Sequence, residues 1–200
     1  MATTSRKNRL PKTKTPEEWQ RLFKSIDTRY PTQARNHCVI YLMYQVGIRI
    51  GEALSLHVSS DLDFDLMKLK VRDGKTGERN VPLPDDAELR RTVERWLAFR
   101  AAWSPESPLL FVTRTGQPLH SNAVRRSMRL YGERSGIGHV SPHAARHSCA
   151  TELLANGATL IGVSRVLGHR RLSTTANSYA WASDSMATEA MGKRIGSSNR

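Results

Sequence analysis

One segment near the start of the chain restricts the possible folds more than any other. Residues 38–46 read CVIYLMYQV, and this run is apolar nearly all round. A helix that is apolar on every side lies inside a protein, whereas a surface helix carries one apolar stripe. The run is too short for a membrane span, which needs about 20 apolar residues. The segment therefore predicts a helix through the middle of a globular core, ended by Gly47.

The segments around this core helix predict more helices and one hairpin. Thr15-Pro16-Glu17-Glu18 is a capping box with proline at the first helical position. Residues 67–71 (MKLKV) and 80–84 (NVPLP) alternate with period two around a polar turn, which is typical of a β-hairpin. A third short strand is expected at LLFVT, and further helices are expected at about 48–56, 85–96, 121–136, 141–157 and 159–167.

These elements predict a mainly α protein with a small antiparallel β-sheet, which is an α+β fold class. A chain of 200 residues is long enough for one domain with a real core. We expect a flexible basic arm at residues 1–14, one domain at 15–182 and a tail at 183–200. In the tail, an apolar stripe after Ser183 predicts a short helix at 183–195 that packs on a partner subunit or on its own domain.

The charge indicates what the protein binds. Thirty-one basic residues against 18 acidic ones give a net charge of +13, and arginines outnumber lysines. Arginine forks suit bidentate phosphate contacts, so a polyanionic partner such as nucleic acid is favoured. Charge alone does not separate DNA from RNA or binding from chemistry, and a solvated basic surface is the alternative.

Other functional classes find little support in the sequence. The N-terminus lacks the apolar run of a secretory signal, so we expect a cytoplasmic protein without a membrane segment. Cys38 and Cys149 lie far apart, without a CxxC or Cys/His cluster nearby, and we expect two buried reduced thiols. The histidines lack metal-ligand spacing, so no metal site is expected.

Two segments in the first half carry candidate functional groups. GIRIGEALSL contains Arg49 and Glu52 at the start of a helix, where the simpler interpretation is an ion pair on a solvated face. GKTGERNVPL carries Lys75 at the predicted hairpin tip. A lysine at a tip is usually a solubilising charge, but this one could also reach a neighbouring phosphate site.

Two more segments lie in the second half. SPHAARHSCATELL carries His143, Arg146 and His147 on one face at a helix N-terminus, which is a geometry that binds anions. The alternative is that these side chains cap surface groups. VLGHRRLSTTANSYAW carries His169 after a glycine turn and then Tyr179, which taken singly would be an ordinary half-buried tyrosine.

Taken in order, these motifs resemble the catalytic domain of the tyrosine recombinases, the phage-integrase family. The resemblance covers Arg-x-x-Glu, the hairpin lysine, His-x-x-Arg, Leu-Gly-His and a tyrosine, from about Thr15 to Tyr179. It implies a site-specific recombinase that cleaves and rejoins DNA through a 3′-phosphotyrosine, without a metal, another cofactor or ATP. Integration, excision, inversion and resolution are all outcomes of this reaction.

The resemblance also implies roles for the cations. Arg49 and Arg146 match the two arginines that clamp the non-bridging oxygens of the scissile phosphate. Lys75 matches the lysine that protonates the departing 5′ oxygen. Such fixed cations suit the reaction because the phosphodiester gathers negative charge in the transition state.

The remaining positions match the other groups of the family site. His143 and His169 match two histidines that hydrogen-bond the phosphate and assist proton movement, and Glu52 matches a carboxylate that orients its neighbours. Tyr179 matches the nucleophile. Ser178 stands where the family usually has this tyrosine, and Tyr179 comes one residue later. A helix irregularity could absorb the extra residue, so Tyr179 remains the expected nucleophile.

A further departure concerns DNA binding. Most members have a helical DNA-clamping domain ahead of the catalytic one, whereas here residues 1–14 precede it, so the chain resembles the short fimbrial phase-variation invertases or a solitary catalytic domain. Its expected partners are double-stranded DNA, three other copies in a tetramer, and accessory DNA-bending proteins. Arg125, Arg126 and Arg129 on one helix are candidate DNA contacts, with a solvated face as the alternative.

Two other functions compete with recombination. A catalytically silent relative could bind DNA and regulate a partner recombinase, although such a protein would be expected to have lost catalytic groups. A topoisomerase-like enzyme could nick and relax DNA through the same tyrosine. Every family position is filled here, which favours the recombinase.

Overall fold

The computed structural model describes residues 14–72, 77–103, 106–169, 171, 173, 175 and 179. Within these residues helices dominate, and one three-stranded antiparallel sheet has the order β1-β2-β3. The predicted fold class is therefore confirmed. The helices are α1 (Pro16–Lys24), α2 (Pro31–Val46), α3 (Ile50–Leu54), α4 (Ala87–Trp103), α5 (Ser121–Arg134), α6 (Pro142–Ala155) and α7 (Leu160–Leu167), and the strands are β1 (Leu62–Asp63), β2 (Lys68–Val71) and β3 (Arg79–Pro82).

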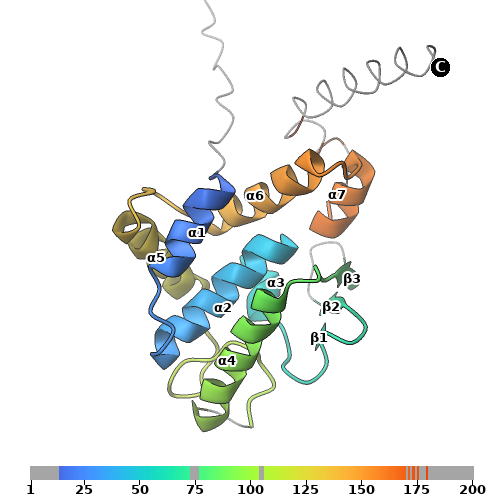
Figure 1. The fold of residues 1–200 in the computed structure, drawn as a ribbon. Coiled ribbons are helices and arrows are strands. Elements are labelled where there is room, and N and C mark those ends of the chain that lie inside the picture. Colours follow the sequence, from blue (N-terminus) through green and yellow to red (C-terminus); the bar gives the residue numbers. More distant parts are fainter. Residues whose placement is uncertain are drawn as a thin grey trace, which may run out of the picture.

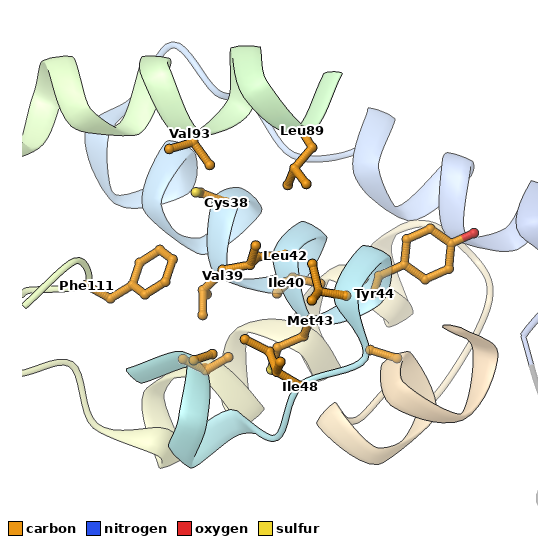
Figure 2. Close-up of a cluster of buried hydrophobic side chains, with 14 of the residues drawn as sticks. Cys38, Val39, Ile40, Leu42, Met43, Tyr44, Ile48, Leu89, Val93 and Phe111 are labelled. Atoms are coloured by element: carbon orange, nitrogen blue, oxygen red, sulfur yellow. The ribbon is translucent and has the colours of Figure 1, made fainter. Parts of the chain in front are cut away.

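The central helix lies where its apolar sequence predicts. α2 runs through the middle of the molecule, with α4 packed on one side and α6 on the other (Figure 1). In Figure 2, Leu89 and Val93 of α4 point at α2, and Phe111 approaches the same helix from a loop. The helix ends at Gly47, whose φ of 69° is left-handed and therefore suits glycine.

Local capping signals in the sequence also form as expected. The Thr15 hydroxyl accepts a hydrogen bond from the Glu18 backbone N–H at 3.3 Å, and the Glu18 carboxylate accepts one from the Thr15 N–H at 2.8 Å. At α6 the Ser141 hydroxyl accepts a hydrogen bond from the Ala144 backbone N–H, with Pro142 at the first helical position. These caps set the direction in which α1 and α6 leave their preceding loops.

The hairpin forms from the two alternating segments. In its register Leu69 pairs with Val81 and Lys70 with Asn80, so Leu69 and Val81 are buried on the same face. β1 adds an edge strand that the sequence did not indicate, through Leu62 opposite Leu69.

The predicted third strand at residues 109–113 is wrong. This segment makes isolated bridges, from Leu109 to His57 and from Val112 to Pro118, rather than a continuous ladder. Its carbonyls bind side chains of α4 instead: the Trp96 indole N–H donates to the Leu110 carbonyl at 2.8 Å. Arg100 donates to the Leu109 carbonyl, so the apolar run is a buried loop tied to α4.

Three other expectations concern the two ends of the chain, the two cysteines and membrane-spanning helices. Residues 1–13 of the predicted arm and the tail at 183–200 lie outside the described residues. Cys38 and Cys149 are buried and unpaired, as predicted. In the part of the chain that the structure describes, no helix is both long and apolar enough to cross a membrane.

Candidate active site

A cavity of about 470 Å³ brings together segments that are distant in the sequence. It lies where the start of α3, the start of α6, one side of α5 and the turn after α7 meet. Six of the lining residues were singled out from the sequence: Arg49, Glu52, Arg125, His143, Arg146 and His169. Three of their neighbours complete the lining: Ile50, Gly51 and Pro142. Lys75 lies outside the described residues.

Arg49 is held in place by the turn that follows α2. The chain reverses at Gly47, and Arg49 becomes the extended N-cap residue of α3. Its guanidinium donates to Glu52 Oε1 at 2.9 Å and to the Gly168 carbonyl at 3.2 Å. Its backbone N–H donates to Glu52 Oε2 at 2.7 Å. The arginine fork is therefore fixed at the cavity wall before any ligand arrives.

Arg146 is fixed still more firmly. It is only 8% exposed, and its two terminal nitrogens donate to the Gly47 carbonyl at 2.7 Å and the Leu167 carbonyl at 2.6 Å. Both carbonyls belong to C-terminal ends of helices, where the backbone dipoles favour a cation. Burial and then the positive charge of Arg49 lower the pKa of Arg146 to about 10, although the negative charge of Glu52 acts in the opposite direction, so Arg146 stays charged at neutral pH.

Glu52 ties two guanidinium groups together. Its carboxylate is 3% exposed and accepts hydrogen bonds from Arg79 at 2.9 and 3.0 Å as well as from Arg49. Burial alone would raise the pKa of Glu52, but the hydrogen bonds and charges of Arg79 and Arg49 outweigh it and lower the pKa. The carboxylate is therefore ionised and holds both arginines by hydrogen bonds.

Sequence reasoning missed Arg79. Arg79 is the first residue of β3 and lies on the same inward face as Val81. A charged side chain on a buried face needs a partner of opposite charge. The alternating pattern of the strand could therefore have indicated a buried ion pair at Arg79. Arg79 also packs on Gly168, where an added Cβ would lie 2.6 Å from the Arg79 Cζ. Gly168 also has a left-handed φ of 63°. Glycine therefore suits this turn both because of its backbone conformation and because a side chain would collide with Arg79.

The Arg79 contact leads to a stability prediction. We expect Arg79→Gln to lower the free energy of unfolding by about 2–3 kcal/mol, which is less than the loss typical of a fully broken buried pair because Glu52 keeps Arg49. Arg91→Gln, which removes the exposed pair with Glu88, should cost less than about 0.5 kcal/mol. Urea unfolding of both variants measures this difference. Equal losses would mean that the Arg79–Glu52 pair contributes no more than a surface pair.

The two predicted histidines of the cavity differ in their surroundings. His143 is exposed in the first turn of α6. The His169 Nδ1 lies 2.7 Å from the Thr175 hydroxyl. Burial, followed by the charges of Arg146 and Arg49, lowers the pKa of His169 to about 4, so this imidazole is neutral at neutral pH.

Tyr179 is not one of the described residues that line this cavity, but it is near enough to Arg146, which does line it, for the arginine charge to influence its pKa. The side chain is 3% exposed and packs in an apolar cluster between α6 and α7 that includes Leu154 and Val163. Its hydroxyl lies 2.7 Å from the Nδ1 of His147. Burial raises the pKa of Tyr179 to about 12, so the hydroxyl keeps its proton at neutral pH.

The predicted DNA-contacting arginines of α5 do not lie together. Arg125 lines the cavity with Arg49 and Arg146, and it donates to the Ser121 hydroxyl at 2.8 Å. Arg126 and Arg129 line a separate hollow on the same helix, where Arg129 lies 4.0 Å from the Glu133 carboxylate. Arg125 and Arg129 share a side of α5 but lie one turn apart along it, whereas Arg126 is turned by about 100° around the helix from Arg125.

The cavity suits a singly charged phosphodiester. Arg49, Arg79 and Arg146 carry three positive charges against the one negative charge of Glu52, so the surroundings are net cationic. Hydrogen bonds to carbonyl and carboxylate groups fix the guanidinium groups, so little reorganisation is needed when an anion enters. Among the described residues, no three His, Cys, Asp or Glu side chains are arranged to hold a metal ion.

Comparison with known proteins gives consistent matches. The profile of the phage integrase family matches residues 12–186. The tyrosine recombinase XerC of Proteus mirabilis is 34% identical over 168 residues, which are 83% of this chain and 53% of the relative. XerC of Histophilus somni is 32% identical over 167 residues, which are 83% of this chain and 55% of the relative. The chain thus spans about half the length of these relatives.

Solved structures show the same likeness. The crystal structure of XerA recombinase matches with a TM-score of 0.77 and 26% identity over 90% of this chain and 65% of that one. XerH recombinase, described as bound to a palindromic difH substrate in a post-cleavage complex, matches with a TM-score of 0.77 and 25% identity. That match covers 94% of this chain and 55% of the XerH chain.

Proposed function

The chain belongs to the phage integrase family, and from this membership we propose that it is a site-specific tyrosine recombinase that cuts and rejoins double-stranded DNA. One observation carries the proposal. Residues of three of the four sequence motifs, from distant parts of the chain, meet at one cavity, where Arg49 and Arg146 are fixed by hydrogen bonds. The finer resemblance to the fimbrial phase-variation invertases stays a prediction, because the matches reported above are to Xer-type recombinases.

In the proposed reaction the cavity binds the scissile phosphate. Arg49 and Arg146 bind its non-bridging oxygens and stabilise the charge that grows there in the transition state. His143 and His169 donate hydrogen bonds to the same group. Glu52 keeps Arg49 in place, as its 2.9 Å contact supports.

Bond changes at the phosphorus balance without an outside reagent. The Tyr179 oxygen forms a bond to phosphorus as its proton passes to a neutral imidazole of the site, and the bond from phosphorus to the 5′ oxygen breaks. Lys75 gives that leaving oxygen a proton. The 3′-phosphotyrosine keeps the energy of the broken bond, so a 5′ hydroxyl from another strand can reverse the step without ATP.

The reaction is tested by incubating the protein with supercoiled plasmids that carry paired target sites or none. Recombinant circles that require paired sites support the proposal. Relaxed circles alone would indicate a topoisomerase-like enzyme, and bound but unchanged DNA would indicate a catalytically silent regulator, so either result would contradict it.

For DNA binding we propose contacts from Arg125, Arg126 and Arg129. Replacing a phosphate-contacting arginine with alanine should lower the slope of log affinity against log salt by about one. Arg125 has the strongest support because it shares the cavity with the clamp arginines. Fluorescence anisotropy at several salt concentrations measures the slope, with Arg91→Ala on α4 as the control. An unchanged slope in all three variants would place the contact elsewhere.

We also propose that four copies assemble on two DNA duplexes, with accessory DNA-bending proteins as further partners. The predicted helix at 183–195 would dock on a neighbouring copy, although it lies outside the described residues. A protein ending at Trp181 should then bind one site but lose cooperative assembly and recombination, as native gels and plasmid assays can measure. Normal assembly of this truncated protein would contradict docking between copies. The cytoplasmic location stays a prediction.

A further inference from the structure

We infer that His147 is a catalytic residue, which accepts the proton of the Tyr179 hydroxyl while the Tyr179 oxygen attacks phosphorus. The inference rests on the proposed function, because it deepens the cleavage step at the same site. The resemblance assigned proton movement to His143 and His169. The histidine within hydrogen-bond distance of the Tyr179 hydroxyl, however, is a third one, His147.

Contact between the two side chains is direct. The His147 Nδ1 lies 2.7 Å from the Tyr179 oxygen, and the two ring centroids are 4.9 Å apart at an angle of 37°. α6 carries His147, whose position is fixed by the helix. A general base must lie within hydrogen-bond reach of the proton that it removes, and His147 meets this condition before DNA binds.

Other groups near Tyr179 are less suited to accept the proton. The Nδ1 of His169 lies 2.7 Å from the Thr175 hydroxyl, and Arg146 is a charged donor that has no lone pair to offer. Cys149 donates to the Gln45 carbonyl, and burial raises the pKa of its thiol to about 12. Glu152 accepts a hydrogen bond from Tyr44, on α2.

The protonation states of His147 and Tyr179 at neutral pH suit a general base and a nucleophile. Burial lowers the pKa of His147 below its ordinary value, so the imidazole is neutral at neutral pH and can accept a proton. The charge of Arg146 favours the phenolate form of Tyr179, while the Cys149 thiol acts in the opposite direction. α7 adds the uncharged Val163 and Leu167 to the cluster. Because Tyr179 is the weaker acid, its proton leaves only as the bond to phosphorus forms.

The position of His147 connects the tyrosine to the phosphate cavity. His143 lines the cavity and His147 follows it by one turn on the same side of α6, a rise of about 5–6 Å. His147 therefore connects the Tyr179 hydroxyl, which it contacts, to the side of α6 that lines the cavity. In the step, the Tyr179 oxygen bonds to phosphorus, its proton passes to the His147 Nδ1, and the 5′ oxygen leaves with a proton from Lys75.

The experiment compares two replacements of His147 in the full chain. In His147→Asn the side-chain oxygen can still accept the hydrogen bond near the Nδ1 position but cannot take up a proton, whereas His147→Ala removes both abilities. With a nicked suicide substrate, we expect the Asn variant to form the covalent adduct at least about 100-fold more slowly than wild type at pH 7. Its rate should rise with pH over a range in which the wild-type rate is constant. His139→Asn, at an exposed site, is the control.

A second substrate distinguishes loss of the general base, His147, from loss of the general acid, Lys75. Replacing the bridging 5′ oxygen with sulfur gives a leaving group that needs no proton, so this substrate should restore cleavage by Lys75→Ala. It should not restore cleavage by His147→Asn, because the nucleophile still has to lose its proton. Restoration of the Asn variant by the sulfur substrate would therefore overturn the inference.

Remaining outcomes distinguish the inference from the proposed function. If wild type forms no adduct at all, the proposed function fails. If wild type forms the adduct and His147→Asn matches its rate at every pH, only the inference fails. Faster cleavage by His147→Ala would also overturn it, because His147 would then hold the tyrosine back.

Discussion

Replacing Tyr179 with phenylalanine is expected to abolish covalent attachment to DNA and to leave DNA binding nearly unchanged. The substitution removes the nucleophilic oxygen and keeps the ring that fills the apolar cluster between α6 and α7. A nicked suicide substrate, which traps the covalent adduct because the cut fragment diffuses away, provides the measurement. Gel shifts on the same DNA report binding.

The matched control for this variant is Tyr131→Phe. Tyr131 is also buried, and its hydroxyl accepts a hydrogen bond from the Asn36 side chain at 3.2 Å. Removing that hydroxyl should cost some stability and leave the adduct in place. Adduct formation by Tyr179→Phe would contradict the assignment of the nucleophile, and Tyr131 would be the next candidate.

The second large effect is expected at the two clamp arginines. Arg49→Ala and Arg146→Ala should each slow cleavage by at least about 10²–10³-fold, a transition-state loss of ~3–4 kcal/mol or more, as for removal of an oxyanion donor. Single-turnover cleavage with saturating protein measures the chemical step apart from binding. A loss smaller than tenfold in either variant would contradict the clamp.

Lysine variants separate charge from geometry at these positions. Arg146 joins the carbonyls that end α2 and α7, so Arg146→Ala should also lower stability. Arg49→Lys and Arg146→Lys keep the charge but lose the fork, and we expect them to remain strongly impaired while unfolding closer to wild type. EDTA should not change the wild-type rate, because the arginines supply the positive charge; loss of activity in EDTA would contradict that account.

Sequence-based prediction succeeded where the determining interactions are local. The capping box at Thr15 and the left-handed end at Gly47 depend on residues within one helical turn, and both form as predicted. The all-round apolar run of α2 has one physical outcome in a chain of this size, which is burial between other helices. Three of the four motifs supply residues that line the cavity, and the order and spacing of these motifs match a known family.

Long-range pairings were the part that the sequence could not supply. The run at 109–113 has the composition of a strand, but its carbonyls bind Trp96 and Arg100 side chains, which no local pattern encodes. Arg79 needs the buried carboxylate of Glu52, 27 residues earlier in the chain. His147 gains its importance from Tyr179, 32 residues later. Each of these contacts becomes visible only when distant segments are brought together.

The central claim is tested most directly by identifying the amino acid that carries the DNA. Wild-type protein would be trapped on a nicked suicide substrate, the adduct digested with protease and nuclease, and the linked peptide sequenced by mass spectrometry. We predict one nucleotide-bearing peptide, modified at Tyr179 through a 3′ phosphate. Attachment through another residue, or through a 5′ phosphate, would contradict the account.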